Sequence, residues 1–353
     1  MTFKAAILAN EMKEDHIGWV RACSKYKQAI ECKVIDLTAF DWLEKVKSEP
    51  FDVFLAKPGG FTERFKNLYD ERCYIIENEL GLFLYPSLKE ILIYENKRLL
   101  SYWLSAHGIP HPRTYVFYNE AEALEFARTA GFPVMAKYNI GGSGSGVYKL
   151  EDRTALESYI RRSFSVKGAP RRWGPNLRQK GLLLRGIRYL FQPGKLGPRL
   201  KVYHEIQRDS QMKMLILQEY IMHEYEWRVV VIGNSYFAHK KMKNGDRASG
   251  SLRKEYEKPP VELLQYCRDI MEKFGFYSQA IDLFDTSDRG FLVNEMQCIF
   301  GQSDPYQMLI EGQSGRYVYR KKHWSFEPGD FNSNESYDLR VSHVLELLKE
   351  KLS

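Results

Sequence analysis

Cysteine is scarce in this 353-residue chain, and the spacing that cysteine chemistry usually shows is missing. The five cysteines, an odd number without a Cys-x-x-Cys pair, are Cys23, Cys32, Cys73, Cys267 and Cys298. This pattern argues against a disulfide framework and a cysteine-based zinc site, and it fits a reducing cytoplasm. The sequence also lacks any run approaching the roughly 18 uncharged apolar residues that a transmembrane helix needs.

A secretion signal is not evident in the first 15 residues. A short apolar run occurs there, but acidic residues follow it without a small-residue cleavage site, so we expect a first strand instead. The apolar share of 44% and the charged share of 27% are those of an ordinary folded soluble protein. At about 150 residues per domain, the length predicts two or three domains.

Acidic residues are absent from one long segment. Between Arg161 and Lys201 the chain has twelve lysines and arginines and no aspartate or glutamate. Because the net charge of the whole chain is +7, subtracting these twelve leaves about −5 for everything else. The sequence therefore predicts a mildly acidic body that carries one basic segment.

Strand and helix patterns alternate in the first part of the chain. This alternation predicts a parallel α/β sheet. The predicted strands are 4–9, 31–37, 51–57 and 82–86, with helices at 16–26 and 71–80. Lys57-Pro58-Gly59-Gly60 follows the third strand, where open α/β sheets place ligand loops, but we favour a simple turn there.

A glycine-rich loop, Gly141-Gly142-Ser143-Gly144-Ser145-Gly146, marks the middle of the chain. It lies between two predicted strands, whereas Walker and Rossmann phosphate loops are followed by a helix, so neither pattern applies. The segments predicted around it are helix 88–108, strand 113–118, helix 119–131, strand 132–139, strand 147–150 and helix 151–163.

The last part of the chain predicts further strands, a hairpin and two helices. Their ranges are strands 214–221, 227–233 and 235–242, helix 261–275, the hairpin of 277–285 with 290–297, and helix 337–352. Residues 320–340 are rich in aromatic and polar side chains. These suit sugar recognition or a cap on the domain surface, and we favour the cap.

Cationic side chains accompany the glycine loop. Lys137 ends an otherwise apolar strand, where a buried ammonium needs an anionic partner. Glycines let backbone N–H groups approach phosphates closely. Lys97 begins a helical segment, where taken alone it would be a solvated residue. These residues predict a phosphate site, with a flexible hairpin loop as the alternative.

A hinge-like segment follows the strand that ends near Glu219. Such a hinge can offer backbone hydrogen bonds to an adenine, and a nearby carboxylate such as Glu226 can hold ribose hydroxyls. Exposed strand-edge charges are the alternative for both glutamates. The basic run 239–250 suits phosphate and carboxylate oxygens, with a solvated charge run as its alternative.

The predicted hairpin carries an acidic pair, Asp282 and Glu295, and Gln297 shares the face of Glu295 because side chains alternate along a strand. Two carboxylates and an amide oxygen are hard ligands that suit Mg²⁺. Both carboxylates lie in apolar runs, where an unpaired charge is costly. Two salt-bridged carboxylates are the alternative.

The order and spacing of these features, over about residues 88–310, resemble the ATP-grasp superfamily of carboxylate–amine ligases. The nearest types are ribosomal-protein glutamate ligases and glutathione-synthetase-like enzymes. The resemblance implies an α/β and α+β protein with the ATP-grasp fold. We predict an N-terminal parallel α/β domain at 1–87, a lid domain at 88–215 with a basic insert at about 161–205, and a C-terminal catalytic domain at 216–353.

The resemblance also implies roles for individual residues. Its cofactors are ATP and Mg²⁺, with Mn²⁺ as a substitute. It implies that Lys97 and Lys137 bind the nucleotide phosphates and that the lid loop consists of Gly141, Gly142, Ser143, Gly144, Gly146 and Val147. The adenine would lie at the hinge Glu219, Tyr220 and Ile221, with its ribose at Glu226. The metal ligands would be Asp282, Glu295 and Gln297, and the catalytic cations Lys243 and Arg247. Gln297 stands where the family usually has asparagine.

The reaction that the resemblance implies is ADP-forming ligation. A substrate carboxylate attacks the γ-phosphate of ATP, and an amine then displaces phosphate from the acyl phosphate, with the protein supplying positioning and charge neutralisation. No covalent enzyme nucleophile is needed. The alternatives are an ATP-grasp phosphotransferase and an ATP-binding regulatory protein with a degenerate metal site.

The basic insert leaves several partners open. It suits an anionic glycan, peptide or lipid-linked acceptor, or an anionic membrane surface, or no partner at all. Nucleic acid is not expected because no recognised binding motif accompanies the charge. A cell-surface glycan acceptor would place the protein in polysaccharide biosynthesis, in the cytoplasm or at the membrane surface. The oligomeric state is not indicated.

Overall fold

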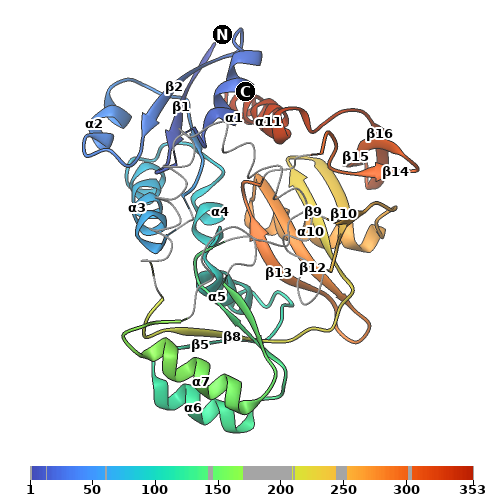
Figure 1. Cartoon of the computed structure of the whole chain (residues 1–353). Helices are drawn as coiled ribbons and strands as arrows, with labels where there is room; N and C mark the ends of the chain where they lie inside the picture. Colours follow the sequence, from blue (N-terminus) through green and yellow to red (C-terminus); the bar gives the residue numbers. More distant parts are fainter. Residues whose placement is uncertain are drawn as a thin grey trace, which may run out of the picture.

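The computed structural model describes residues 2–12, 14–59, 62–141, 146–169, 209, 211–243, 253–300 and 304–352. These residues form three β-sheets with helices packed against them (Figure 1). Within the described ranges, no helix combines the length and apolar character needed to cross a bilayer.

The N-terminal part is a parallel sheet in the order β2-β1-β3-β4, as the alternating pattern predicted. Its two central strands are almost wholly buried, which explains why they are near-continuous apolar runs. The elements are β1 (Phe3–Ala9), α1 (Ile17–Lys25), β2 (Ile30–Asp36), α2 (Trp42–Lys47), β3 (Val53–Ala56), α3 (Glu63–Tyr74), the π-helical turn η1 (Ile75–Glu79) and β4 (Leu84–Tyr85).

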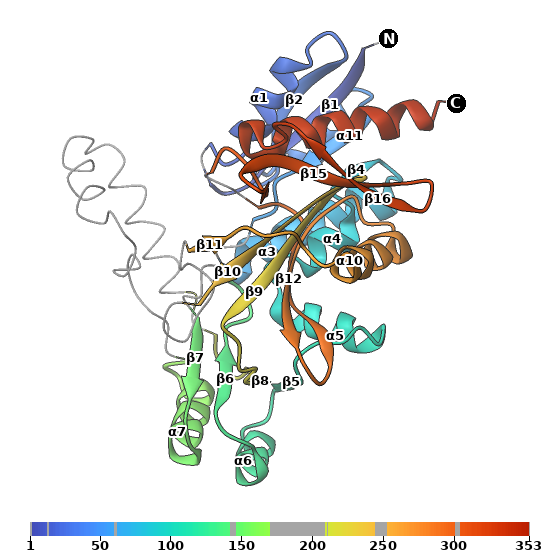
Figure 2. The same ribbon diagram turned by 90° about the vertical axis from the view of Figure 1, so that its right-hand side faces the viewer.

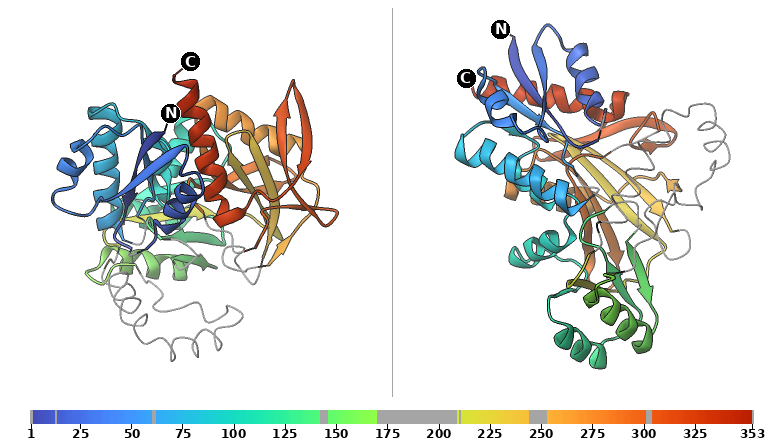
Figure 3. Two further views of the ribbon diagram at one scale, coloured as in Figure 1. Left: turned by 90° about the horizontal axis from the view of Figure 1, so that it is seen from above. Right: turned by 60° about the vertical axis from the view of Figure 1, so that its left-hand side comes forward.

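The last helix of the chain, α11 (Tyr337–Glu350), belongs to the core of this N-terminal part (Figure 3). The Tyr337 ring packs edge-on against Trp19 of α1, with ring centroids 5.0 Å apart. A Cβ atom at Gly18 would lie 2.5 Å from that ring, so glycine permits the close approach of the two segments. The two ends of the chain therefore share one apolar core.

The helix predicted over 88–108 is wrong in one respect, because the structure divides it into α4 (Leu88–Ile93) and α5 (Lys97–Ala106). Glu95, between them, has a left-handed backbone with a φ of 51°. The Asn96 side chain accepts a hydrogen bond from the Leu99 N–H and caps α5. The break places Lys97 at the first position of α5, in agreement with the prediction that it begins a helical segment.

The sheet of the predicted lid domain, which we call the lid sheet, is antiparallel in the order β5-β8-β6-β7 and packs against helices α6 and α7 (Figure 2). The predicted boundary at 215–216 falls inside β8, which pairs with β5 and β6, so that strand belongs to the lid sheet. The elements are β5 (Thr114–Phe117), α6 (Glu120–Thr129), β6 (Val134–Lys137), β7 (Val147–Leu150), α7 (Arg153–Phe164) and β8 (Leu215–Glu219).

The third sheet lies in the predicted C-terminal catalytic domain, and we call it the catalytic sheet after that prediction. It is antiparallel and runs β13-β12-β9-β10-β15-β14, with β11 on β10 and β16 on β15. The predicted hairpin of 277–285 with 290–297 is confirmed by the pairing of β12 with β13. The elements are β9 (Tyr225–Ile232), β10 (Ser235–Met242), β11 (Lys254–Glu255), α10 (Val261–Phe274), β12 (Ser278–Thr286), β13 (Gly290–Gln297), β14 (Leu309–Ile310), β15 (Gln313–Arg320), β16 (His323–Pro328) and the 3₁₀ turn η3 (Ser333–Ser336).

The aromatic stretch near residue 320 folds as the hairpin of β15 and β16. Trp324 lies edge-on against Tyr236, with ring centroids 4.8 Å apart, and its indole N–H donates to Gln265 at 3.3 Å. These contacts hold the hairpin against the catalytic domain, as the interpretation of a surface cap predicted.

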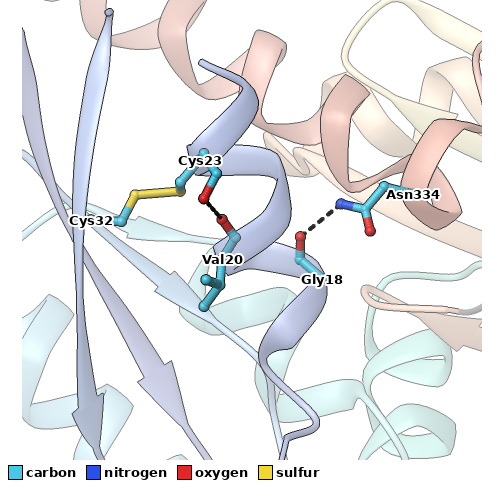
Figure 4. The surroundings of a disulfide bond; sticks show 6 residues. Gly18, Val20, Cys23, Cys32 and Asn334 are labelled. Carbon is cyan, nitrogen blue, oxygen red and sulfur yellow. Dashed lines mark hydrogen bonds between the residues drawn. A yellow bond between two sulfur atoms is a disulfide. The ribbon is translucent and has the colours of Figure 1, made fainter. Parts of the chain in front are cut away.

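The expectation that the cysteines form no disulfide is wrong for Cys23 and Cys32 (Figure 4). Helix α1 packs over β2, so their Cα atoms lie 6.3 Å apart, within the range that a disulfide spans. An odd cysteine count does not prevent this pairing. Nearby, the Asn334 amide donates to the Gly18 carbonyl at 2.8 Å and ties η3 to α1.

Candidate active site

Lys97 and Lys137 come from different parts of the chain and line one small cavity between α5, the lid sheet and strand β13. Lys97 is held at the start of α5, and its Nζ donates to the Gly141 carbonyl at 2.7 Å. The cavity holds about 20 Å³, which is room for about one water molecule.

Lys137 is a half-buried lysine at the end of β6. Its Nζ donates to the Asn294 side-chain oxygen at 3.0 Å, and Asn294 is the extra residue of a β-bulge on β13. Burial, with the charge of Lys97, lowers the pKa of Lys137 to about 8. Within the described residues its one hydrogen-bond partner is a neutral amide, so the position suits an anionic ligand.

A row of charged side chains crosses the catalytic sheet. Glu295 on β13 lies opposite Asp282 on β12, Asp282 lies opposite Arg228 on β9, and Arg228 lies opposite His239 on β10. Residues directly opposite each other share a face of the sheet. The register of four strands therefore assembles this row from residues that are spread over positions 228 to 295 of the sequence.

Asp282 is surrounded by cations. Arg228 donates from Nε to Oδ1 at 2.7 Å and from Nη2 to Oδ2 at 2.8 Å, and Lys241 donates to Oδ2 at 2.6 Å. Burial alone would raise the pKa of Asp282, but Arg228 and Lys241 hold it well below its usual range. Both oxygens of this predicted metal ligand are thus already engaged.

Glu226, the predicted ribose carboxylate, is also drawn into this network. It is 5% exposed, it accepts from Lys241 at 2.9 Å, and it accepts from the Asn294 amide at 3.3 Å. The His223 Nε2 atom lies 3.9 Å from its second oxygen. The ribose role stays a prediction, since a ribose would have to compete with these donors.

Gln297 links two charged groups through its amide. Its nitrogen donates to Glu95 Oε1 at 3.1 Å, and its oxygen accepts from Arg228 Nη2 at 3.4 Å. Rotating the amide would set oxygen against carboxylate and nitrogen against guanidinium, so the network fixes its orientation. The metal-binding role of Gln297 stays a prediction, and its oxygen faces a cation that the protein itself provides.

The predicted adenine hinge, Glu219 to Ile221, lies at the end of β8, between the lid sheet and β9 of the catalytic sheet. The Glu219 carboxylate accepts from the Arg113 N–H and from Arg289, both at 2.7 Å. Lys243, predicted as a catalytic cation, donates to the Tyr220 hydroxyl at 2.8 Å. Lys243 therefore lies at the hinge, and its predicted contact with a γ-phosphate remains untested.

The predicted lid loop is described only at its ends. Gly142, Ser143, Gly144 and the predicted catalytic Arg247 lie outside the described residues. Val147 pairs with Lys137, which confirms the strand–loop–strand arrangement. A Cβ atom at Gly146 would lie 2.5 Å from Tyr138 Cβ, so this end of the loop requires glycine.

A hard divalent cation would suit the carboxylate of Glu95. The Glu95 side chain is 9% exposed, and among the described residues its Oε2 atom has no hydrogen-bond partner. Burial raises the pKa of this carboxyl, and the charge of Glu295 contributes to the rise. Over the described ranges no trio of His, Cys, Asp or Glu side chains is grouped as a metal site, so further ligands would come from the nucleotide or water.

The sequence patterns assigned no role to Glu95, Arg228 or Asn294, and they included Lys241 only as part of the basic run 239–250. Arg228 lies two positions after Glu226, and this alternation on a strand was an available signal. Glu95 was hidden inside a helix that the structure breaks.

The solved structures that this chain resembles share one architecture. One is the D-alanine–D-alanine ligase of Bacillus anthracis, with a TM-score of 0.53 at 14% identity, covering 99% of this chain and 100% of that one. Another is the N5-carboxyaminoimidazole synthetase of Staphylococcus aureus complexed with ADP, with a TM-score of 0.56 at 11% identity, covering 98% and 78%. The chain therefore has the ATP-grasp fold, and the predicted fold is confirmed.

A curated relative is the α-aminoadipate–LysW ligase LysX of Saccharolobus solfataricus, 23% identical over 220 residues. The match covers 60% of this chain and 65% of the relative, so the chain spans just under two thirds of that protein. A match to the arginine-specific carbamoyl phosphate synthase large chain of Bacillus subtilis, 29% identical over 129 residues, covers 36% of this chain and 12% of that one. No protein-family profile matches the chain.

Proposed function

We propose that the protein is an ADP-forming ligase that joins a carboxylate to an amine. The observation that carries the proposal is that Lys97 and Lys137 line one cavity, between the lid sheet and the catalytic sheet, together with Asn294. Asn294 precedes Glu295 of the charged row on β13, and Glu295 lies opposite Asp282. The ATP-grasp fold and the ligase names of LysX and the Bacillus anthracis protein support it.

The side chains around this cavity and along the charged row match the needs of phosphoryl transfer. Lys97 and Lys137 supply positive charge to the nucleotide phosphates, and Arg228 is positioned to steady the carboxylate that becomes phosphorylated. A bound Mg²⁺, held by carboxylates of the row, would neutralise charge on the transferred phosphoryl group. The lid excludes water, which would otherwise hydrolyse an acyl phosphate.

A larger cavity adjoins this region on the N-terminal side and suits the substrates. Its volume is about 460 Å³, within the roughly 300–1,000 Å³ of small-molecule sites. Its lining includes the cations Arg21, Lys57 and Arg228 and the acids Glu14, Asp15 and Glu335. This balance favours a molecule that carries both a carboxylate and an amine, such as an amino acid. The Lys57 loop, predicted as a simple turn, thus lines the cavity.

Phosphate release in the presence of paired substrates tests the proposal. The purified protein, with ATP and Mg²⁺, is assayed against amino acids, dicarboxylates and acidic sugars, alone and in pairs. Phosphate release that needs both a carboxylate and an amine, together with an amide product in the mass spectrum, is the expected result. Lys137→Met should abolish it, whereas Arg128→Ala, an exposed cation on lid helix α6, should retain it.

Two other results of the same assay would replace the proposal. A stable phosphorylated product formed without an amine would identify a phosphotransferase. ADP and ATP binding without any turnover would identify a regulatory nucleotide-binding protein.

For the acceptor, the charge of the basic insert supports an anionic glycan, peptide or lipid-linked molecule. Most of the insert lies outside the described residues, but its flanks are close, because the Ala169 N–H donates to the Gln211 carbonyl at 2.9 Å. A short Gly–Ser linker can therefore replace residues 171–207 with little effect on either flank. Weaker binding to anionic liposomes or polyanions is expected, and unchanged binding would remove the acceptor proposal.

A further inference from the structure

Glu95 is the most unusual residue of the site, because its backbone and its side chain are both held in unfavourable states. A φ of 51° is uncommon for any residue other than glycine, asparagine or aspartate. Strained backbone of this kind persists only where the surroundings impose it, and it concentrates at functional sites. Here the break between α4 and α5 turns a carboxylate toward the phosphate lysine, Lys97.

The contacts of the Glu95 carboxylate are incomplete. Oε1 accepts from Gln297 at 3.1 Å, whereas Oε2 has no hydrogen-bond partner in the part of the chain that the structure describes. The nearest cation, Lys97 Nζ, lies 3.8 Å from Oε2 and donates to Gly141 instead. A buried carboxylate oxygen without a donor is costly to the folded protein.

The protein's own cations are engaged elsewhere in the site. Arg228 and Lys241 donate to Asp282, whereas among the described residues the hydrogen bond that Glu95 accepts comes from the neutral Gln297 amide. Glu95 and Glu295 are also close enough to interact electrostatically. A hard divalent cation would relieve both charges, because Mg²⁺ binds through one or two carboxylates and takes its other ligands from phosphates and water.

We propose that Glu95 is a ligand of the divalent cation and acts with Glu295 on the face of the site next to Lys97. The inference rests on the proposed function, since the nucleotide phosphates supply the remaining ligands. It adds a residue from the α4–α5 break to the hairpin residues Asp282, Glu295 and Gln297. It also explains why the chain breaks a helix at this position.

Direct binding of Mn²⁺ to the ADP complex tests this assignment without any turnover. Free Mn²⁺ is counted by electron paramagnetic resonance in titrations of the wild type, Glu95→Gln and Glu295→Gln. Each of these variants should bind Mn²⁺ at least about tenfold more weakly, because each loses a charged ligand. Glu125→Gln removes an exposed carboxylate on α6 and should match the wild type.

Two additional measurements separate metal binding from other effects of Glu95. ADP affinity in EDTA should be unchanged in Glu95→Gln but lowered in Lys97→Ala, because Glu95 is not proposed to act through Lys97. Glu95→Asp keeps the charge on a shorter side chain and should bind Mn²⁺ with intermediate affinity. It carries the test if thermal unfolding shows that Glu95→Gln is not folded.

The outcomes separate the assignment of Glu95 as a metal ligand from the proposed ligase function. Wild-type Mn²⁺ affinity in a folded Glu95→Gln or Glu95→Asp protein would overturn the assignment of Glu95 and leave the proposed ligase standing. A wild-type protein that binds no Mn²⁺ in the presence of ADP would overturn both.

Discussion

Asp282, in the middle of the catalytic sheet, and Glu95, at the break between α4 and α5, are both buried carboxylates in one active-site region. Asp282 receives three hydrogen bonds from Arg228 and Lys241. Within the described ranges Glu95 receives one, from the Gln297 amide, and its Oε2 atom receives none and lies 3.8 Å from Lys97 Nζ. The negative charge of Asp282 is balanced within the protein. The charge of Glu95 is balanced less completely, and we expect a bound cation to complete it.

Charged residues of the site whose charge is balanced within the protein differ in their expected role from those whose charge a ligand would balance. Lys137 belongs with Glu95, because its one hydrogen-bond partner in the described residues is the Asn294 amide. Lys241 belongs with Asp282, since it contacts two carboxylates. Substitutions of Glu95 and Lys137 should alter ligand binding, and substitutions of Asp282 and Lys241 should alter stability.

The largest effect on stability is expected for Asp282→Ala. It leaves Arg228 and Lys241 buried without their shared counter-ion, so the free energy of unfolding should fall by about 3–5 kcal/mol. Urea denaturation in metal-free buffer measures the loss. Glu95→Ala, measured alongside, should lose far less, and equal losses in the two variants would contradict the comparison.

Lys137→Met should show the opposite pattern. Removing a half-buried ammonium that lacks a carboxylate partner should leave the free energy of unfolding unchanged or raise it. ADP affinity should fall about 10–100-fold, since a charge-assisted hydrogen bond contributes roughly 1.5–3 kcal/mol. Isothermal calorimetry measures the affinity, with Arg128→Ala as the matched control. Unchanged ADP binding would place the phosphates elsewhere.

His239, at the end of the charged row, should make stability depend on pH. Burial and the neighbouring Arg228 lower its pKa to about 3, so it stays neutral in the folded protein while the unfolded chain takes up a proton below about pH 6.5. Stability should therefore fall as the pH drops from 6.5 toward 3.

The conservative variant His239→Gln lacks this proton uptake. Between pH 6.5 and 5 the wild type should lose about 1.6 kcal/mol more than the variant, because the unfolded histidine is already half protonated at pH 6.5 and the loss approaches 1.36 kcal/mol per pH unit only below it. Urea midpoints at the two pH values measure the difference. Parallel losses in the two proteins would show that His239 does not titrate as described.

The smallest effect is expected for Arg289→Ala. The ion pair of Arg289 with Glu219 connects the hairpin turn to the lid, but the two side chains are 34% and 27% exposed. Its removal should cost less than about 1 kcal/mol, and high salt should reduce the difference further. A loss above about 2 kcal/mol would mean that this exposed pair stabilises the fold as a buried one does.

The sequence patterns predicted the architecture well where local signals were strong. The alternation around Asp282 and Glu295 predicted the β12–β13 hairpin, and the glycine loop after Lys137 was correctly assigned between two strands. Apolar runs and their spacing determine such elements, and no distant contact is needed to recognise them.

The contacts that define the site could not be predicted in the same way. Arg228 meets Asp282 only because β9 pairs with β12 in one register, and neither residue carries that information alone. The break at Glu95 lies in a segment whose apolar pattern continues from α4 into α5, so the pattern favoured one helix. The pairing of Cys23 with Cys32 likewise depends on how α1 packs over β2.

The position of the divalent cation tests the central claim most directly. A crystal structure of the protein with ADP and Mn²⁺ locates the metal by its anomalous signal. The account predicts a peak within about 2.2 Å of carboxylate oxygens of both Glu95 and Glu295, with Arg228 still bonded to Asp282. A peak coordinated by Asp282, with Glu95 Oε2 left uncoordinated, would contradict it.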